Sequence, residues 1–143
     1  MVLGTGIDIV ETERIAQAVE RFGQRFLDRV FHAGEVEYAR TMKKPNLHLA
    51  ARFAAKEAIS KAFGTGIGRL LGWKDIEICR RESGEPYVVM RGKGAELARA
   101  RGVPLLQAAR LIVETEELKP KPRRALADLI AAFDRWRSLI ESM

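Results

Sequence analysis

The chain has 143 residues, 47% of them hydrophobic, so it can bury one compact core and we expect a single domain over residues 1–143. Its formal charge of +6 (25 basic against 19 acidic residues) favours an acidic partner without naming it. No apolar run approaches a membrane span, and the opening residues lack the charged start and apolar middle of a signal peptide, so we expect none. The single cysteine, Cys79, excludes an internal disulfide. We therefore expect a cytoplasmic protein with no membrane span.

The opening stretch, residues 2–10, is apolar and rich in β-branched side chains, which predicts a buried strand. Asp8 lies inside this stretch, between Ile7 and Ile9. A carboxylate in a buried strand is costly unless it is paired or binds a metal ion. Asp8 is therefore a candidate metal ligand, with an open strand face or a helix cap as the ordinary alternatives.

Residues 11–22 have helical periodicity, and Arg14 and Arg21 lie off the apolar face. Arg25 continues this basic surface, for which a solvated charged face is the ordinary explanation. Two short helices are predicted next, over residues 25–31 and 34–42. Their apolar side chains are expected in the core: Leu27, Val30, Phe31, Val36, Tyr38 and Met42.

The clearest helix is predicted over residues 46–63, which contain six alanines. Asn46 is the expected N-cap, and Gly64 can take the left-handed conformation that ends a helix.

Polar side chains follow two neighbouring lines of this helix. Glu57 and Lys61 are one turn apart on one line, and Arg52 and Lys56 lie on the next. Spacing alone is compatible with a solvent-facing ion pair between Glu57 and Lys61. If Asp8 lies beside Glu57, however, the two carboxylates can hold Mg²⁺, whose other positions are filled by waters and substrate phosphates.

Both ends of this helix offer candidate phosphate contacts. His48 lies in the first turn, where anions are favoured. Gly64 and Gly66 belong to a glycine-rich stretch, residues 64–68, whose backbone N–H groups can approach a phosphate. The same stretch is equally compatible with an ordinary flexible connection, and no Walker motif follows it.

The next elements are a hairpin and a short helix. Residues 73–79 alternate between apolar and acidic side chains, residues 83–86 are typical of a turn, and residues 87–90 read as a second strand. A short helix is predicted over residues 92–101.

Three motifs in this order carry a resemblance to a known family. They are Gly-Ile-Asp-Ile-Val-Glu (6–11) with Arg14-Ile15, Arg-Phe-Ala-Ala-Lys-Glu-Ala (52–58) with Lys61, and Trp-Lys-Asp-Ile-Glu-Ile (73–78). Together they resemble holo-(acyl-carrier-protein) synthase, the small bacterial class of 4′-phosphopantetheinyl transferases, over about residues 1–102. The resemblance implies an α+β fold, with a small, mostly antiparallel sheet packed on the long helix, and a homotrimer with active sites at subunit interfaces.

The resemblance also implies a reaction. Such enzymes transfer the 4′-phosphopantetheine of coenzyme A to a serine of apo-acyl carrier protein and release adenosine 3′,5′-bisphosphate. Asp8 and Glu57 would hold Mg²⁺, and Glu57 would remove the serine proton directly or through a metal-bound water. Lys61 would stabilise pyrophosphate charge, and Gly64 would contact coenzyme A with Gly66 and His48. We expect a role in fatty acid biosynthesis, with a polyketide pathway as the alternative.

Further basic residues are assigned roles by the same resemblance. Arg14, Arg21 and Arg25 match the basic residues that dock the acidic helix of acyl carrier protein. Arg52 and Lys56 are expected to assist either phosphate or carrier-protein binding.

From residue 103 onward the resemblance fails, because the family's Ser-Leu-Ser-His segment is missing and no histidine follows His48. Residues 108–115 can replace a family strand, residues 119–122 form a stiff linker, and residues 123–140 are predicted as an amphipathic helix. That helix packs on its own domain, on another subunit or on a membrane surface. The tail is either a natural replacement or the product of a reading frame shifted near residue 103.

Two other functions stay open. The missing segment is compatible with a catalytically impaired family member that binds coenzyme A or carrier protein without efficient transfer. Net charge alone favours a nucleic-acid-binding module, but the sequence has no recognised motif for reading DNA or RNA, so we expect no nucleic-acid partner.

Overall fold

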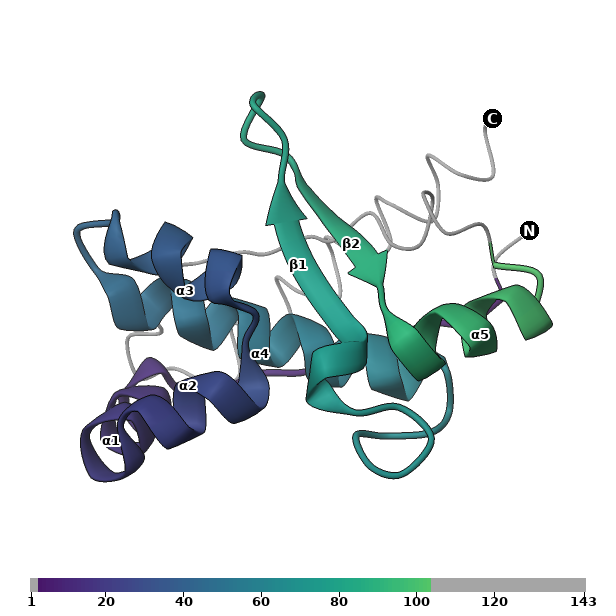
Figure 1. Cartoon of the computed structure of the whole chain (residues 1–143), viewed down its shortest axis with the longest axis horizontal. Helices are drawn as coiled ribbons and strands as arrows, with labels where there is room; N and C mark the ends of the chain where they lie inside the picture. Colours follow the sequence, from purple (N-terminus) through teal and green to yellow (C-terminus); the bar gives the residue numbers. More distant parts are fainter. Residues whose placement is uncertain (1–2, 104–143) are drawn as a thin grey trace, which may run out of the picture.

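A computed structural model of the chain describes residues 3–103 (Figure 1). Helices α1 (Thr12–Phe22), α2 (Gln24–Val30) and α3 (Ala33–Arg40) gather at one end of the molecule. Helix α4 (Pro45–Ala62) spans the molecule behind a β-hairpin, and α5 (Gly92–Ala100) lies at the other end. Among these helices none is both long and apolar enough to cross a membrane. The elements predicted over residues 108–115 and 123–140 lie outside the described residues.

Helix α4 begins one residue earlier than predicted, at Pro45, so the prediction of Asn46 as N-cap is wrong. Lys44 is the N-cap residue and makes no side-chain cap hydrogen bond. Proline fits the first helical position because its fixed φ is helical and the N–H that it lacks would have no partner there. The other end is as predicted, since the helix ends at Ala62 and Gly64 is left-handed, with φ of 72°.

The hairpin pairs β1 (Ile76–Arg80) with β2 (Pro86–Met90) in an antiparallel register that places Ile76 opposite Met90. The first strand starts three residues later than predicted, because residues 73–75 form a 3₁₀ turn. The Asp75 carboxylate holds this turn by accepting a hydrogen bond of 2.7 Å from the Gly72 N–H. The predicted small antiparallel sheet packed on the long helix is confirmed, with α4 in contact with β1.

Two hydrophobic clusters form the core, and α4 contributes to both. One lies between α4, the hairpin and α5, and it includes Ile59, Ile76 and Val88. The other lies between α4 and the first three helices. Four side chains predicted for the core are buried in this second cluster: Leu27, Val30, Phe31 and Val36. Tyr38 and Met42 are only partly buried.

The predicted opening strand is not a strand within the described residues. Residues 3–10 pair with no other strand, and in the described part of the chain no backbone hydrogen bond ties them to another segment. A ladder needs a partner strand, and this segment instead lies against α4, where Gly4 approaches Ala62 and Gly6 approaches Ala58. The Asp8 side chain is therefore only partly buried, at 18% exposure.

Candidate active site

Three of the predicted site residues come together where the opening segment meets the second half of α4. The Lys61 Nζ donates to the Asp8 Oδ1 at 2.7 Å and to the Ile7 carbonyl at 3.3 Å. Helical side chains lean toward the N-terminus of their helix, so Lys61 leans toward Glu57, one turn earlier. The Asp8 charge acts on the Glu57 carboxyl, which places the two acids within electrostatic reach of each other.

The protonation of Glu57 reflects this arrangement. Burial raises the pKa of the Glu57 carboxyl above its ordinary value, the Asp8 charge raises it further, and the Lys61 ammonium acts in the opposite direction. Lys61 is correspondingly favoured in its charged form, since its hydrogen bond to Asp8 raises the pKa of the ammonium. The cluster therefore combines a carboxyl adapted to exchange protons with a fixed cation.

The same cluster fits a divalent cation. Asp8 and Glu57 supply hard carboxylate oxygens, and Mg²⁺ usually takes only one or two carboxylates besides waters and substrate phosphates. In residues 3–103 no group of three or more His, Cys, Asp or Glu side chains is arranged to enclose a metal ion. The residues present thus fit an open magnesium site and not a closed, all-protein one.

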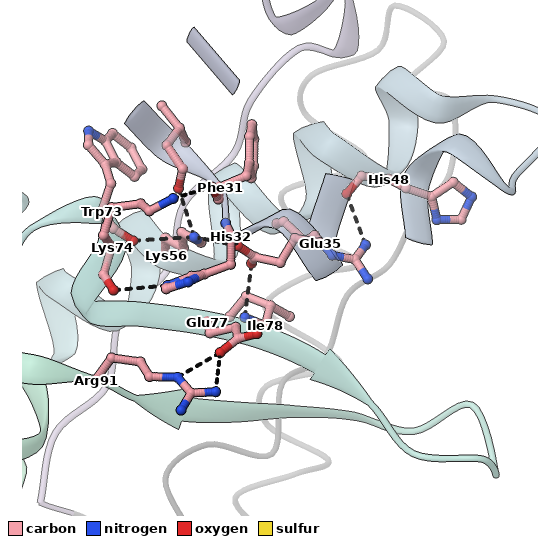
Figure 2. Close-up of polar contacts among 12 residues, drawn as sticks. Phe31, His32, Glu35, His48, Lys56, Trp73, Lys74, Glu77, Ile78 and Arg91 are labelled. Atoms are coloured by element: carbon pink, nitrogen blue, oxygen red, sulfur yellow. Dashed lines mark hydrogen bonds and ion pairs between the residues drawn. The ribbon is translucent and has the colours of Figure 1, made fainter. Parts of the chain in front are cut away.

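Lys56 is not available for binding phosphate or carrier protein, so that expectation is wrong. Its side chain is fully buried, and its Nζ donates to the Glu35 Oε2 and the Val30 carbonyl, both at 2.8 Å, and to the Trp73 carbonyl at 3.2 Å (Figure 2). Burial lowers the pKa of the ammonium, and the Glu35 carboxylate opposes that shift. Lys56 therefore joins α4 to α3 and to the segments that carry these carbonyls.

Glu35 completes this network and was missed by the sequence reasoning. Its two oxygens also accept hydrogen bonds from the His32 N–H at 2.7 Å and the Ile78 N–H at 2.9 Å (Figure 2). A signal was present in the sequence, because a glutamate three residues after a helix start is typical of a capping box, and α3 has one. Lys56, the partner of Glu35 on α4, had no comparable signal in the sequence.

A group of basic and aromatic side chains lies beside the first half of α4. The Arg52 guanidinium stands 4.4 Å from the centre of the Tyr38 ring, and Arg80 faces the same ring at 5.4 Å. The His48 ring meets Tyr38 edge-on at 5.7 Å. Arg52 is buried, and its Nε has no hydrogen-bond partner within the described residues. Arg52 thus keeps one donor that no described residue uses, although that nitrogen is buried from solvent.

His48 therefore does not join the cluster of Asp8, Glu57 and Lys61. At ~1.5 Å per residue, His48 and Lys61 are roughly 20 Å apart along α4. Burial lowers the pKa of the His48 imidazole, and the charges of Arg52 and Arg80 lower it further. Its role in binding coenzyme A stays a prediction.

The glycines that follow α4 have their amides occupied. The Gly64 N–H donates to the Lys61 carbonyl at 2.9 Å, and the Gly66 N–H donates to the Ser60 carbonyl at 3.2 Å. Both residues have positive φ, at 72° and 63°, which suits glycine at the end of a helix. The expected phosphate contact through these N–H groups thus competes with capping of α4, and contact of Gly64 and Gly66 with coenzyme A stays a prediction.

The three arginines predicted for carrier-protein docking are all exposed. Arg14 and Arg21 are on α1, and Arg25 is at the start of α2. Arg21 lies 5.1 Å from the ring centre of Phe22, which is itself 54% exposed. This surface thus adds an exposed aromatic ring to three cations.

Comparison with known proteins places the chain in a family. The model of the 4′-phosphopantetheinyl transferase superfamily matches residues 4–109. The holo-(acyl-carrier-protein) synthase of Koribacter versatilis is 48% identical over 102 residues, which are 71% of this chain and 82% of that protein. The chain belongs to the holo-(acyl-carrier-protein) synthase family. The resemblance of the three motifs is thereby confirmed.

Solved structures of the family agree with this fold. The holo-(acyl-carrier-protein) synthase of Neisseria meningitidis is 35% identical and covers 71% of this chain and 82% of its own, with a TM-score of 0.66. The enzyme of Helicobacter pylori, in complex with coenzyme A, is 33% identical and covers 68% and 80%, with a TM-score of 0.61. The α+β class predicted from sequence is confirmed.

Proposed function

We propose that this protein transfers the 4′-phosphopantetheine of coenzyme A to a serine of apo-acyl carrier protein. The proposal rests on the gathering of Asp8, Glu57 and Lys61 in a chain of this family. The serine oxygen bonds to the phosphorus that carries the pantetheine arm, and the bond from that phosphorus to the bridging oxygen breaks. The serine proton leaves, and the second product is adenosine 3′,5′-bisphosphate.

Each residue of the cluster has a proposed part. Asp8 and Glu57 would hold Mg²⁺, and the bound ion would supply positive charge against the pyrophosphate. A carboxylate oxygen of Glu57 accepts the serine proton, a role that suits a carboxyl with a raised pKa. Lys61, whose ammonium donates to Asp8 in the structure, would offset the charge that builds up on the pyrophosphate.

The distance between His48 and Lys61 along α4 supports an active site shared between subunits. The 3′-phosphate and the pyrophosphate of coenzyme A are joined through one ribose, so they lie much closer together than the ~20 Å that separates His48 from Lys61 along α4. One molecule of coenzyme A can therefore reach both His48 and Lys61 only if two subunits contribute one residue each. We propose a homotrimer in which His48, Arg52 and Arg80 of one subunit bind the adenosine end, beside the Asp8–Glu57–Lys61 cluster of the next.

The basic surface of α1 and α2 is the proposed docking site for acyl carrier protein. Arg14, Arg21 and Arg25 are exposed there, so they can steer an acidic partner at long range. These charges set the rate of encounter more than the strength of the final complex.

Substitution of the two acids tests the proposal. Asp8→Ala and Glu57→Ala should each slow the conversion of apo- to holo-carrier protein by at least ~100-fold, because each removes a metal ligand that stabilises transition-state charge. The measurement is a gel-shift assay with saturating Mg²⁺ and coenzyme A. A near-normal rate in either variant would exclude that acid from the mechanism.

The missing Ser-Leu-Ser-His segment favours a second candidate, a family member that binds coenzyme A or carrier protein without efficient transfer. Calorimetric titration of coenzyme A followed by the transfer assay separates the two candidates. Binding without turnover in the full-length chain supports the second.

A further inference from the structure

The opening segment lies directly on the backbone of α4, and two glycines make this approach possible. A Cβ built on Gly6 would overlap the Ala58 carbonyl oxygen and would stand 2.7 Å from the Ala62 backbone nitrogen. A Cβ on Gly4 would overlap the Ala62 carbonyl oxygen. These neighbours are backbone atoms of a helix, so they cannot move aside as a side chain would.

Few other contacts fix the position of this segment. Within the described residues it belongs to no sheet and makes no backbone–backbone hydrogen bond. Lys61 donates to the Ile7 carbonyl and to Asp8, but its side chain is half exposed, and such ion pairs stabilise little. The alternate side chains Leu3, Ile7 and Ile9 are exposed. The glycine contact is therefore the most rigid one that the segment makes with α4.

We propose that Gly6 is a positioning residue for the Asp8 carboxylate. Because it has no side chain, Gly6 lets the segment touch the α4 backbone. Asp8, which follows two residues later, is thereby held at the distance from Glu57 that a shared divalent cation requires. This inference rests on the proposed function, because it assumes that Asp8 and Glu57 are metal ligands. Gly6 itself touches neither metal nor substrate.

A methyl group on Gly6 would displace the opening segment by more than a metal site tolerates. Nonbonded heavy atoms normally stay roughly 3.5 Å apart, so a methyl group on Gly6 must lift the segment from α4. Metal–ligand distances are held to about ±0.2 Å, and Mg²⁺ demands nearly ideal octahedral geometry. The opening segment can therefore shift without unfolding the protein, but the same shift is too large for Asp8 to remain a metal ligand.

Mn²⁺ binding tests this inference without turnover. Electron paramagnetic resonance on the full-length protein, with coenzyme A and no carrier protein, should show at least ~10-fold weaker binding in Gly6→Ala, since a poorly placed carboxylate loses much of its contribution. Gly34→Ala is the matched control, because nothing lies within 4 Å of a Cβ there and its φ is not positive. It should bind Mn²⁺ as the wild type does.

A double-mutant cycle separates positioning from general damage. If Gly6 acts through Asp8, then Gly6→Ala combined with Asp8→Asn should bind Mn²⁺ no more weakly than Asp8→Asn alone. A further loss in the double variant, or wild-type affinity in Gly6→Ala, overturns the inference and leaves the proposed metal site intact. Absence of Mn²⁺ binding by the wild-type protein overturns both.

Discussion

Two lysines on the same helix illustrate how position decides the role of a residue. Lys56 and Lys61 are five residues apart, and each pairs with a carboxylate. Lys56 is fully buried and satisfies three acceptors, whereas Lys61 is half exposed and holds Asp8 beside Glu57. Lys56 is therefore a structural residue, whereas the half-exposed Lys61 stays accessible for the role proposed for it.

Replacing these lysines should separate stability from catalysis. Lys56→Met leaves the Glu35 charge buried and unpaired, which should lower the free energy of unfolding by roughly 3–5 kcal/mol. Lys61→Met should leave the urea midpoint nearly unchanged and slow transfer. Chemical denaturation of both variants checks this, and equal stability losses would contradict the distinction.

The raised pKa of Glu57 predicts a dependence on its two charged neighbours. Asp8→Asn should lower the pKa of Glu57 toward its ordinary value of 4.5, and Lys61→Met should raise it further. Because the folded state holds the proton more tightly than the unfolded state, Glu57 contributes stability below its ordinary pKa that is lost as pH rises through the raised value. Carbon-13 NMR titration of the Glu57 carboxyl measures both shifts, and shifts in the opposite directions would contradict the arrangement.

At the scale of elements, α4 was predictable and the opening segment was not. Alanine content and Gly64 identified α4 to within one residue at each end, since both signals are local. The residues around Asp8 have the composition of a strand, but a strand also needs a partner, which no local signal reveals. Neither the buried Glu35–Lys56 pair nor the stacking of Tyr38 with two arginines is local in sequence, so pattern alone did not place them.

The basic surface of α1 and α2 gives a prediction at this scale. Reversing Arg14, Arg21 and Arg25 to Glu should raise the KM for acyl carrier protein and leave the KM for coenzyme A unchanged, because only the carrier protein meets these charges. The effect should diminish with added salt, which screens exposed charges. Kinetics at two salt concentrations test this, and an unchanged carrier-protein KM would rule out the docking surface.

For the whole molecule, the distance between His48 and Lys61 along α4 is the reason to propose an oligomer as the working unit. Asp8, Glu57 and Lys61 carry the proposed chemistry, and the group around Arg52 is the proposed site for the adenosine end. In the proposed closed ring each subunit would present one group to its neighbour, and the two groups together would make a complete site.

Mixed oligomers test this arrangement. Glu57→Ala disables one half of each site, and the double variant His48→Ala/Arg80→Ala disables the other half. With random exchange of subunits, about a quarter of the sites should regain both intact halves. Transfer at limiting coenzyme A should therefore recover well above the mean of the two separate variants. Recovery no greater than that mean would show that each subunit works alone.

Asp8 and Glu57 are proposed to act together in moving phosphopantetheine to the carrier serine. Mass spectrometry of apo-acyl carrier protein after incubation with the wild-type protein, coenzyme A and Mg²⁺ measures this most directly. We predict that the carrier protein gains the mass of one phosphopantetheine group. This modification should not occur when a chelator is present in the reaction, and it should be strongly reduced with Glu57→Ala. An unmodified carrier protein with the wild type, or full modification with Glu57→Ala, would contradict the account.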